Sequence, residues 1–80
     1  MNNKLQLPEV GELYKIKKRT VFISIGKFHY LDKDDIVLLL SFKEFSYNKD
    51  LFIFLVGNKQ RYCIFLNKKD FNQHFSLYEN

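Results

Sequence analysis

The chain has 80 residues and a net charge of +4, from 13 basic and nine acidic side chains. Its single cysteine and two histidines exclude an internal disulfide and a zinc finger. Nine Phe and five Tyr supply the core instead, because each aromatic ring can bury about 150–250 Å². We expect one domain over residues 1–80, with residues 1–6 as a loose N-terminal arm.

The composition also indicates a compartment. The first residues lack the apolar segment of a signal peptide, and no stretch reaches the roughly 20 apolar residues of a membrane helix. A lone cysteine agrees with a reducing environment. We therefore expect a cytoplasmic protein with no membrane partner.

The first third of the chain predicts two strands and carries the whole excess of positive charge. Residues 12–17 alternate imperfectly between apolar and polar side chains, which indicates a strand. The β-branched composition of residues 20–25 indicates a second strand, which Gly26 ends. Residues 27–31 then lead into an acidic turn at 32–35, because aspartates bond their own backbone in tight turns.

The middle of the chain predicts a third strand. Residues 36–45 begin as an apolar run and end in alternation, although helix is the rival interpretation. One face of this strand would hold Ile36, Leu38, Leu40 and Phe42, and we expect the strand to be buried at one end and to emerge at the other. Residues 46–50 are polar and predict a loop.

The strongest signal lies at residues 51–66, where two apolar runs flank Gly57 and Asn58 and predict a β-hairpin. A four-residue loop at 57–60 would place Val56 opposite Arg61. One face would then carry Leu51, Ile53, Leu55, Tyr62, Ile64 and Leu66, and the other Phe52, Phe54, Val56, Cys63 and Phe65. Since both faces are apolar, the sheet must curl on itself, carry another layer or meet a second chain, and we expect a homodimer.

The chain ends in a different pattern. Asn67 is a suitable helix cap, and Asp70 lies where a negative charge favours a helix N-terminus. Phe71 and Phe75 form an i, i+4 pair on one face. These residues predict a short helix or 3-10 turn over 68–76.

The extended entry LPEVGELYKI, the strand at 36–45, the hairpin at 51–66 and the terminal turn together resemble a small SH3-like β-barrel. The length and residue usage are similar to those of bacteriophage proteins. The resemblance implies an all-β, mainly antiparallel barrel of about five strands with a short C-terminal helix or 3-10 turn. It does not imply polyproline binding, because the chain has no Trp. If the protein is phage-encoded, its compartment is the host cytoplasm.

The sequence offers no catalytic constellation. Cys63 lies in the middle of a predicted strand, and His29 and His74 have no neighbouring motif. The isolated glycines form no phosphate-binding loop. The aspartates at 32–35 have Val37 where a calcium loop requires Gly. We expect a non-enzymatic protein with no catalytic residue, metal site or cofactor.

A basic and aromatic segment at residues 14–30 is the main functional signal. Lysines that neutralise phosphates, beside rings that stack on bases, are typical of nucleic-acid binding, with RNA or single strands preferred. Two alternatives stay open: a solubilising sheet edge, and a phage-type inhibitor or adaptor that binds a host protein through apolar sheet surface. The predicted nucleic-acid-binding residues are Lys15, Lys17, Lys18, Arg19, Lys27, Phe28, His29 and Tyr30.

Overall fold

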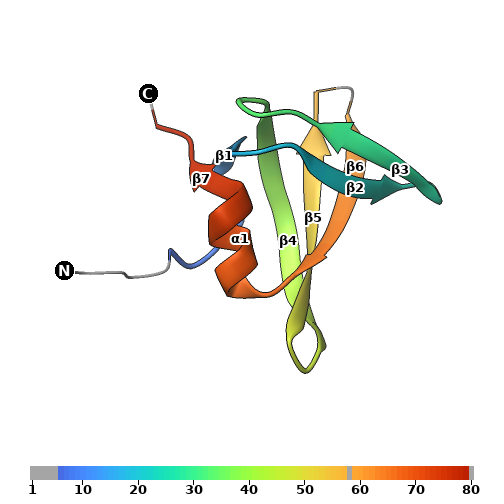
Figure 1. Cartoon of the computed structure of the whole chain (residues 1–80), viewed down its shortest axis with the longest axis vertical. Coiled ribbons are helices and arrows are strands. Elements are labelled where there is room, and N and C mark those ends of the chain that lie inside the picture. Colours follow the sequence, from blue (N-terminus) through green and yellow to red (C-terminus); the bar gives the residue numbers. More distant parts are fainter. Residues whose placement is uncertain (1–5, 58, 80) are drawn as a thin grey trace.

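The computed structural model describes residues 6–57 and 59–79, which form one antiparallel sheet and one helix (Figure 1). In spatial order the strands run β3-β2-β6-β5-β4-β1-β7. The elements in chain order are β1 (Leu13–Ile16), β2 (Thr20–Ser24), β3 (Lys27–Leu31), β4 (Ile36–Ser46), β5 (Lys49–Val56), β6 (Gln60–Leu66), α1 (Lys68–His74) and β7 (Phe75–Leu77).

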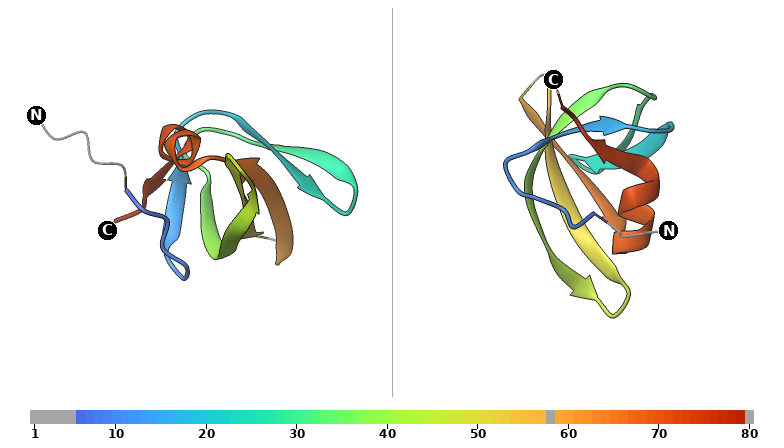
Figure 2. Two further views of the ribbon diagram at one scale, coloured as in Figure 1. Left: turned by 90° about the horizontal axis from the view of Figure 1, so that it is seen from below. Right: turned by 90° about the vertical axis from the view of Figure 1, so that its left-hand side faces the viewer.

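The sheet curls into an open half-barrel, and α1 covers its concave face (Figure 2). The helix contributes Phe71, whose ring stacks on Phe52 with centroids 4.7 Å apart. Phe75 follows it and stacks on Phe54 at 4.8 Å. The core is therefore a cluster of aromatic and aliphatic side chains between α1 and the sheet, made of Tyr14, Ile16, Phe22, Val37, Leu39, Phe52, Phe54, Tyr62, Ile64, Phe71 and Phe75.

Helix α1 begins as the sequence predicts. The Asn67 side chain accepts a hydrogen bond of 2.7 Å from the Asp70 N–H, so it satisfies one of the donors that a helix start leaves free. The predicted end at residue 76 is wrong, because the helix ends at His74 and Phe75 already has extended backbone. The expected Phe71–Phe75 pair is confirmed, with ring centroids 5.0 Å apart.

The antiparallel, mainly β class is confirmed, but about five strands were expected and the described residues contain seven. The two additional strands are β3, which follows Gly26 directly, and β7, which follows α1 without a loop. Both lie at the ends of the sheet. A strand at the edge of a sheet packs against a neighbour on one side only. Its sequence is therefore under less pressure to show the alternation by which a strand is recognised.

The predicted register of the central hairpin is wrong by one residue. Val56 pairs with Gln60 rather than Arg61, because Lys59 takes a left-handed backbone (φ 63°) and its N–H donates to the Val56 carbonyl. A shift of one residue changes which side chains share a face. Phe52, Phe54, Tyr62 and Ile64 are buried together, whereas Leu51, Ile53, Leu55, Cys63 and Phe65 lie half-buried on the convex face.

The prediction that Ile36, Leu38, Leu40 and Phe42 share one face of the third strand is also wrong. In β4 the buried residues are Val37 and Leu39, and not Ile36, Leu38 or Leu40. A β-bulge between Leu39 and Ser41 then inserts one residue and reverses the alternation. Beyond it Phe42 lies on the concave side, stacked on Phe52 at 5.5 Å.

The structure also corrects the predicted loop at residues 46–50. The polar segment 46–50 is not a loop throughout, since β5 starts at Lys49 and Asp50 is buried. Of the predicted arm at 1–6, residues 1–5 lie outside the described residues. Gln6 is fixed, because its N–H and carbonyl each bond the Asn72 side chain at 2.9 Å.

Candidate interaction surface

The hairpin of β2 and β3 projects from the half-barrel, and its loop is the two-residue turn Ile25-Gly26 (Figure 2). Side chains alternate across the hairpin because successive strand residues point to opposite sides. Phe22 and Ser24 are buried on the concave side. Val21 and Ile23 lie on the convex side, where solvent reaches them.

Five apolar side chains of this hairpin are exposed, and we call them the hairpin patch. Cross-strand pairing brings Val21 beside Tyr30 and Ile23 beside Phe28. The exposed fractions are 42% for Val21, 38% for Ile23, 89% for Ile25, 73% for Phe28 and 60% for Tyr30. Large contiguous apolar patches are uncommon on the surface of a monomer.

The patch continues across the convex face of the sheet. Ile23 pairs with Cys63 of β6, and Cys63 pairs with Ile53 of β5. Phe65 lies on the same face and contacts the ring of Phe45, with centroids 4.7 Å apart. The apolar area therefore reaches from the hairpin to the middle of the sheet.

Three of the predicted phosphate-binding side chains contact their own chain. The Lys15 ammonium lies 3.9 Å from the Asp34 carboxylate, and the Lys17 ammonium donates to the Asn72 carbonyl at 2.9 Å. The Arg19 Nε lies 3.6 Å from Asp32. Both ion pairs are exposed and contribute little to stability, but they place negative charge inside the predicted basic face.

The structure brings together only some of the predicted site residues. The Arg19 guanidinium lies 4.5 Å over the Tyr30 ring, and Phe28 shares their side of the hairpin. His29 points to the opposite side, where its ring stacks on Tyr62 at 4.8 Å. Lys15 belongs to β1, which pairs with neither β2 nor β3. Lys18 and Lys27 are exposed.

The prediction at residues 14–30 missed the aliphatic members of the hairpin patch. The segment TVFISI holds a usable signal, because a buried Phe22 requires Val21 and Ile23 to point outwards. Ile25 had no such signal. It occupies the tip with a left-handed backbone (φ 50°), which is uncommon for a β-branched residue, and Gly26 follows at φ 71°. A turn of this form prefers Asn-Gly.

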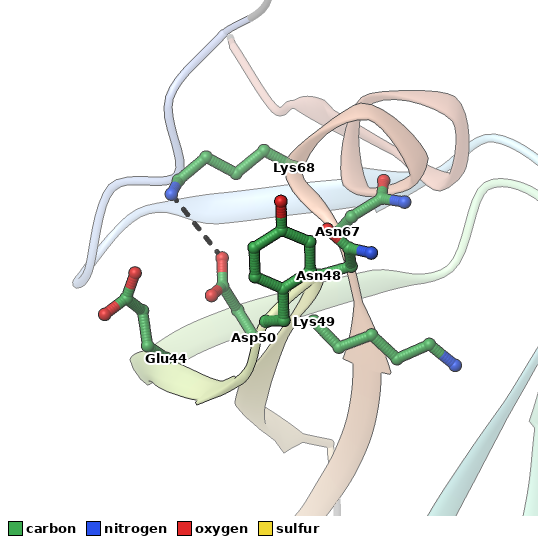
Figure 3. A pocket seen from close by; sticks show the side chains of 7 residues that line it. Glu44, Asn48, Lys49, Asp50, Asn67 and Lys68 are labelled. Atoms are coloured by element: carbon green, nitrogen blue, oxygen red, sulfur yellow. Dashed lines mark ion pairs between the residues drawn. The ribbon is translucent and has the colours of Figure 1, made fainter.

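A small open pocket lies between the β4–β5 turn and the start of α1 (Figure 3). The Lys68 ammonium lies 3.6 Å from the buried Asp50 carboxylate, so the ion pair ties the helix to β5. Among the described residues no group of three His, Cys, Asp or Glu side chains could hold a metal ion. The lining residues are Glu44, Tyr47, Asn48, Lys49, Asp50, Asn67 and Lys68.

The hydroxyl of Thr20 and the imidazole of His74 form a close pair that has a structural role rather than a catalytic one. The Thr20 Oγ lies 2.8 Å from the His74 Nδ1, which is the distance expected between a nucleophile and its base. However, Thr20 is only 2% exposed, and its hydroxyl donates to the Lys18 carbonyl at 2.7 Å. A substrate has no access to that oxygen, so the pair joins β2 to α1.

The chain matches no protein-family model, no curated protein and no solved structure. Within the described residues, no helix is long and apolar enough to cross a membrane. The function therefore has to be inferred from the surface itself. Among the described residues, the hairpin patch is a group of neighbouring apolar side chains that lies outside the hydrophobic core.

Proposed function

We propose that the protein is a non-enzymatic binding module that docks onto another protein through the hairpin patch. The observation that carries this proposal is the exposure of five neighbouring apolar side chains on a projecting hairpin. Val21, Ile23 and Ile25 have no polar group, so the water around them is best displaced by an apolar groove of a partner protein. The left-handed Ile25 adds weight, because such strain collects at functional loops.

The charges around the patch define the partner further. Lys27 follows the tip, and Arg61 lies on the convex face, paired with the half-buried Leu55. Positive groups around an apolar centre favour a partner with acidic residues around its groove. The proposed partner is therefore a protein with an apolar groove and an acidic rim.

The family proposal follows from the same fold. The antiparallel half-barrel is compatible with a barrel fold, and the entry strand LPEVGELYKI resembles the first strand of SH3-like barrels. We extend the proposal to a barrel of that type from a bacteriophage. On that basis the partner is a host protein, which the chain inhibits or links to another component.

Single-stranded nucleic acid is the second candidate, and one observation favours it. Arg19, Tyr30 and Phe28 place a cation and two exposed rings on one side of the hairpin, which suits a phosphate and stacked bases. The candidate ranks second because Lys15, Lys17 and Arg19 already contact groups of their own chain. It also leaves the aliphatic residues without a role.

The protein-docking proposal is tested with Ile25→Asn, which suits the turn and is expected to fold. Tagged protein is purified from the cells that produce it, and bound partner is quantified by its ratio to the bait. We expect a stoichiometric partner with the parent chain and a loss of at least tenfold with Ile25→Asn. Tyr47→Asn is the matched control, since Tyr47 is 98% exposed in the turn of the β4–β5 hairpin. Equal partner yield from all three chains contradicts the proposal.

The nucleic-acid candidate is tested by fluorescence anisotropy with a labelled single-stranded RNA over a salt series. Replacing Lys17, Lys18 and Arg19 by Gln should lower the salt slope by about 0.7 for each phosphate that the variant no longer neutralises. Phe28→Ala should weaken binding by about 1–3 kcal/mol with an unchanged slope if the ring stacks on a base. Lys49→Gln with Lys69→Gln is the control, since both lysines are exposed and lie outside the basic segment. No binding by the parent chain at low salt removes this candidate.

A further inference from the structure

Strand β3 is an end strand whose outer edge is open. In the part of the chain that the structure describes, β3 pairs with β2 alone and lies first in the sheet. Proteins usually protect such an edge with Pro, a bulge or a charge in the middle of the strand. The sequence KFHYL has its only lysine at one end and two exposed rings at its centre.

The hairpin geometry determines which backbone groups face that edge. Ser24 and Lys27 flank a two-residue turn with positive φ at both turn residues, so they form a hydrogen-bonded pair. Hydrogen-bonded and non-hydrogen-bonded pairs alternate along an antiparallel ladder. His29 and Leu31 therefore bond inwards to β2, and the N–H and C=O groups of Phe28 and Tyr30 point outwards.

We propose that β3 binds β3 of a second copy of this chain, antiparallel, with a two-fold axis at His29. In this register Phe28 lies opposite the partner's Tyr30, and Tyr30 lies opposite the partner's Phe28. Every outward N–H and C=O of these residues then has a partner. The two half-barrels join into one continuous sheet. This inference does not rest on the proposed function.

In this register the side chains of β3 are complementary to those of β3 in the second copy. Two aromatic cross-strand pairs form on the convex side, where Phe28 and Tyr30 are now exposed. Lys27 lies opposite the partner's Leu31 rather than another lysine, so no like charges meet. A symmetric register centred on Phe28 would pair Tyr30 with Gly26 of the turn, and one centred on Tyr30 would pair Phe28 with Asp32 beyond the strand. Only the axis at His29 uses both aromatic residues.

The size of the contact sets the expected strength. A five-residue edge and two ring pairs bury less than the roughly 1,200 Å² at which stable protein interfaces begin. We therefore expect a dimer that forms and dissociates with concentration. Val21, Ile23 and Ile25 stay accessible in it, so the dimer would carry two copies of the aliphatic part of the hairpin patch.

Disulfide trapping tests the register directly. In a Cys63→Ser background the chain has no other cysteine, and His29→Cys places two thiols in a directly opposed non-hydrogen-bonded pair. Such pairs have Cα atoms about 4.5 Å apart, within the range of a disulfide. We expect mild oxidation to cross-link His29→Cys at least tenfold more than Phe28→Cys or Tyr30→Cys, since neither of these is opposite itself. Equal cross-linking of the three variants overturns the register.

Charge reversal tests the same contact without cross-linking. Phe28→Lys with Tyr30→Glu places opposite charges across the dimer, whereas Phe28→Lys with Tyr30→Lys places like charges there. Both double variants remove the same rings from one exposed side of the monomer. Sedimentation over a wide concentration range should give a dimer at least tenfold weaker for the like-charge variant than for the opposite-charge variant. Equal association of the two variants, or a parent chain that stays monomeric throughout, overturns the proposal. Ile25→Asn should leave the dimer intact, so failure here is distinguishable from failure of protein docking.

Discussion

The fold changes the properties of two residues, the backbone conformation of Ile25 and the pKa of His74. The Ile25 backbone is left-handed at an 89% exposed position, where its side chain gains little from packing. Burial lowers the pKa of His74, and the nearby positive charge of Lys18 lowers it further. Both residues therefore allow tests in which one substitution changes stability in a known direction.

Replacing Ile25 by Asn should stabilise the protein. Asn tolerates the left-handed region, and Asn-Gly is the preferred pair for this turn. We expect a gain of about 1 kcal/mol in the free energy of unfolding, which raises the thermal midpoint by roughly 4–8 °C in a domain of this size. Differential scanning calorimetry measures it. Gly26→Ala is the opposite control, because φ at Gly26 is 71° and Ala there should destabilise. A lower midpoint for Ile25→Asn would contradict the strain argument.

His74 should make stability depend on pH. Its pKa in the folded protein lies below the unfolded value near 6.5, so the unfolded chain binds more protons between the two values. Stability contributed by neutral His74 is complete above about pH 6.5 and is lost as the pH falls towards the lower folded pKa. Urea unfolding from pH 7.5 to 5 should show this fall, with His74→Asn flattening the curve relative to the parent chain. Parallel curves for the two chains would contradict it.

At the scale of elements, the register of β5 against β6 decides which side chains form the core. Phe54 is fully buried and stacks on Phe75, whereas its neighbour Ile53 is half-buried on the convex face. A single residue of register separates these outcomes. The two neighbours therefore form a matched pair for a stability measurement.

Phe54→Ala should cost about 3–5 kcal/mol, because it removes a ring from a packed core. Ile53→Ala should cost about 1 kcal/mol, since solvent already reaches that side chain. Chemical denaturation of both variants gives the comparison. The register that we predicted from sequence placed Ile53 in the same set as Tyr62 and Ile64. A larger loss for Ile53→Ala than for Phe54→Ala would favour that register over the structure.

The sequence predicts elements whose signals are local. Asn67 and Asp70 define the start of α1 within four residues, and the structure confirms that start. The bulge after Leu39 and the left-handed Lys59 have no such signal, because each depends on the strand that pairs alongside. These two features explain why the sequence assigned the wrong sets of residues to the faces of β4 and of the central hairpin.

The candidate site shows the same limit on local reasoning. Phe28 and Tyr30 were selected from composition and are indeed exposed together. The engagement of Lys15 and Arg19 depends on the aspartate turn, 13 or more positions further along the chain, which composition does not reveal. Ile25 was overlooked because its exposure follows from a turn type rather than from a residue pattern.

For the whole molecule, the two faces of the sheet have different roles. The concave face is closed by α1, whose Phe71 stacks on Phe52 and meets Tyr14 edge-on, with centroids 5.2 Å apart. The convex face carries apolar residues that nothing among the described residues covers, such as Phe45 at 62% exposure. Aromatic rings on the two faces should therefore contribute very differently to folding.

Phe71→Ala, made alone, should remove about 3–5 kcal/mol, which is comparable to the whole stability of a domain this small. We expect this variant to lose its cooperative thermal transition, because α1 detaches and exposes the concave core to water. Phe45→Ala is the matched control, since it also truncates one Phe but on the convex face, where its ring forms a tilted pair with Phe65. Circular dichroism should show a midpoint for Phe45→Ala within a few degrees of the parent. If Phe71→Ala melts cooperatively near the parent temperature, α1 does not close the core, and the half-barrel must be stabilised by a layer on its convex side instead.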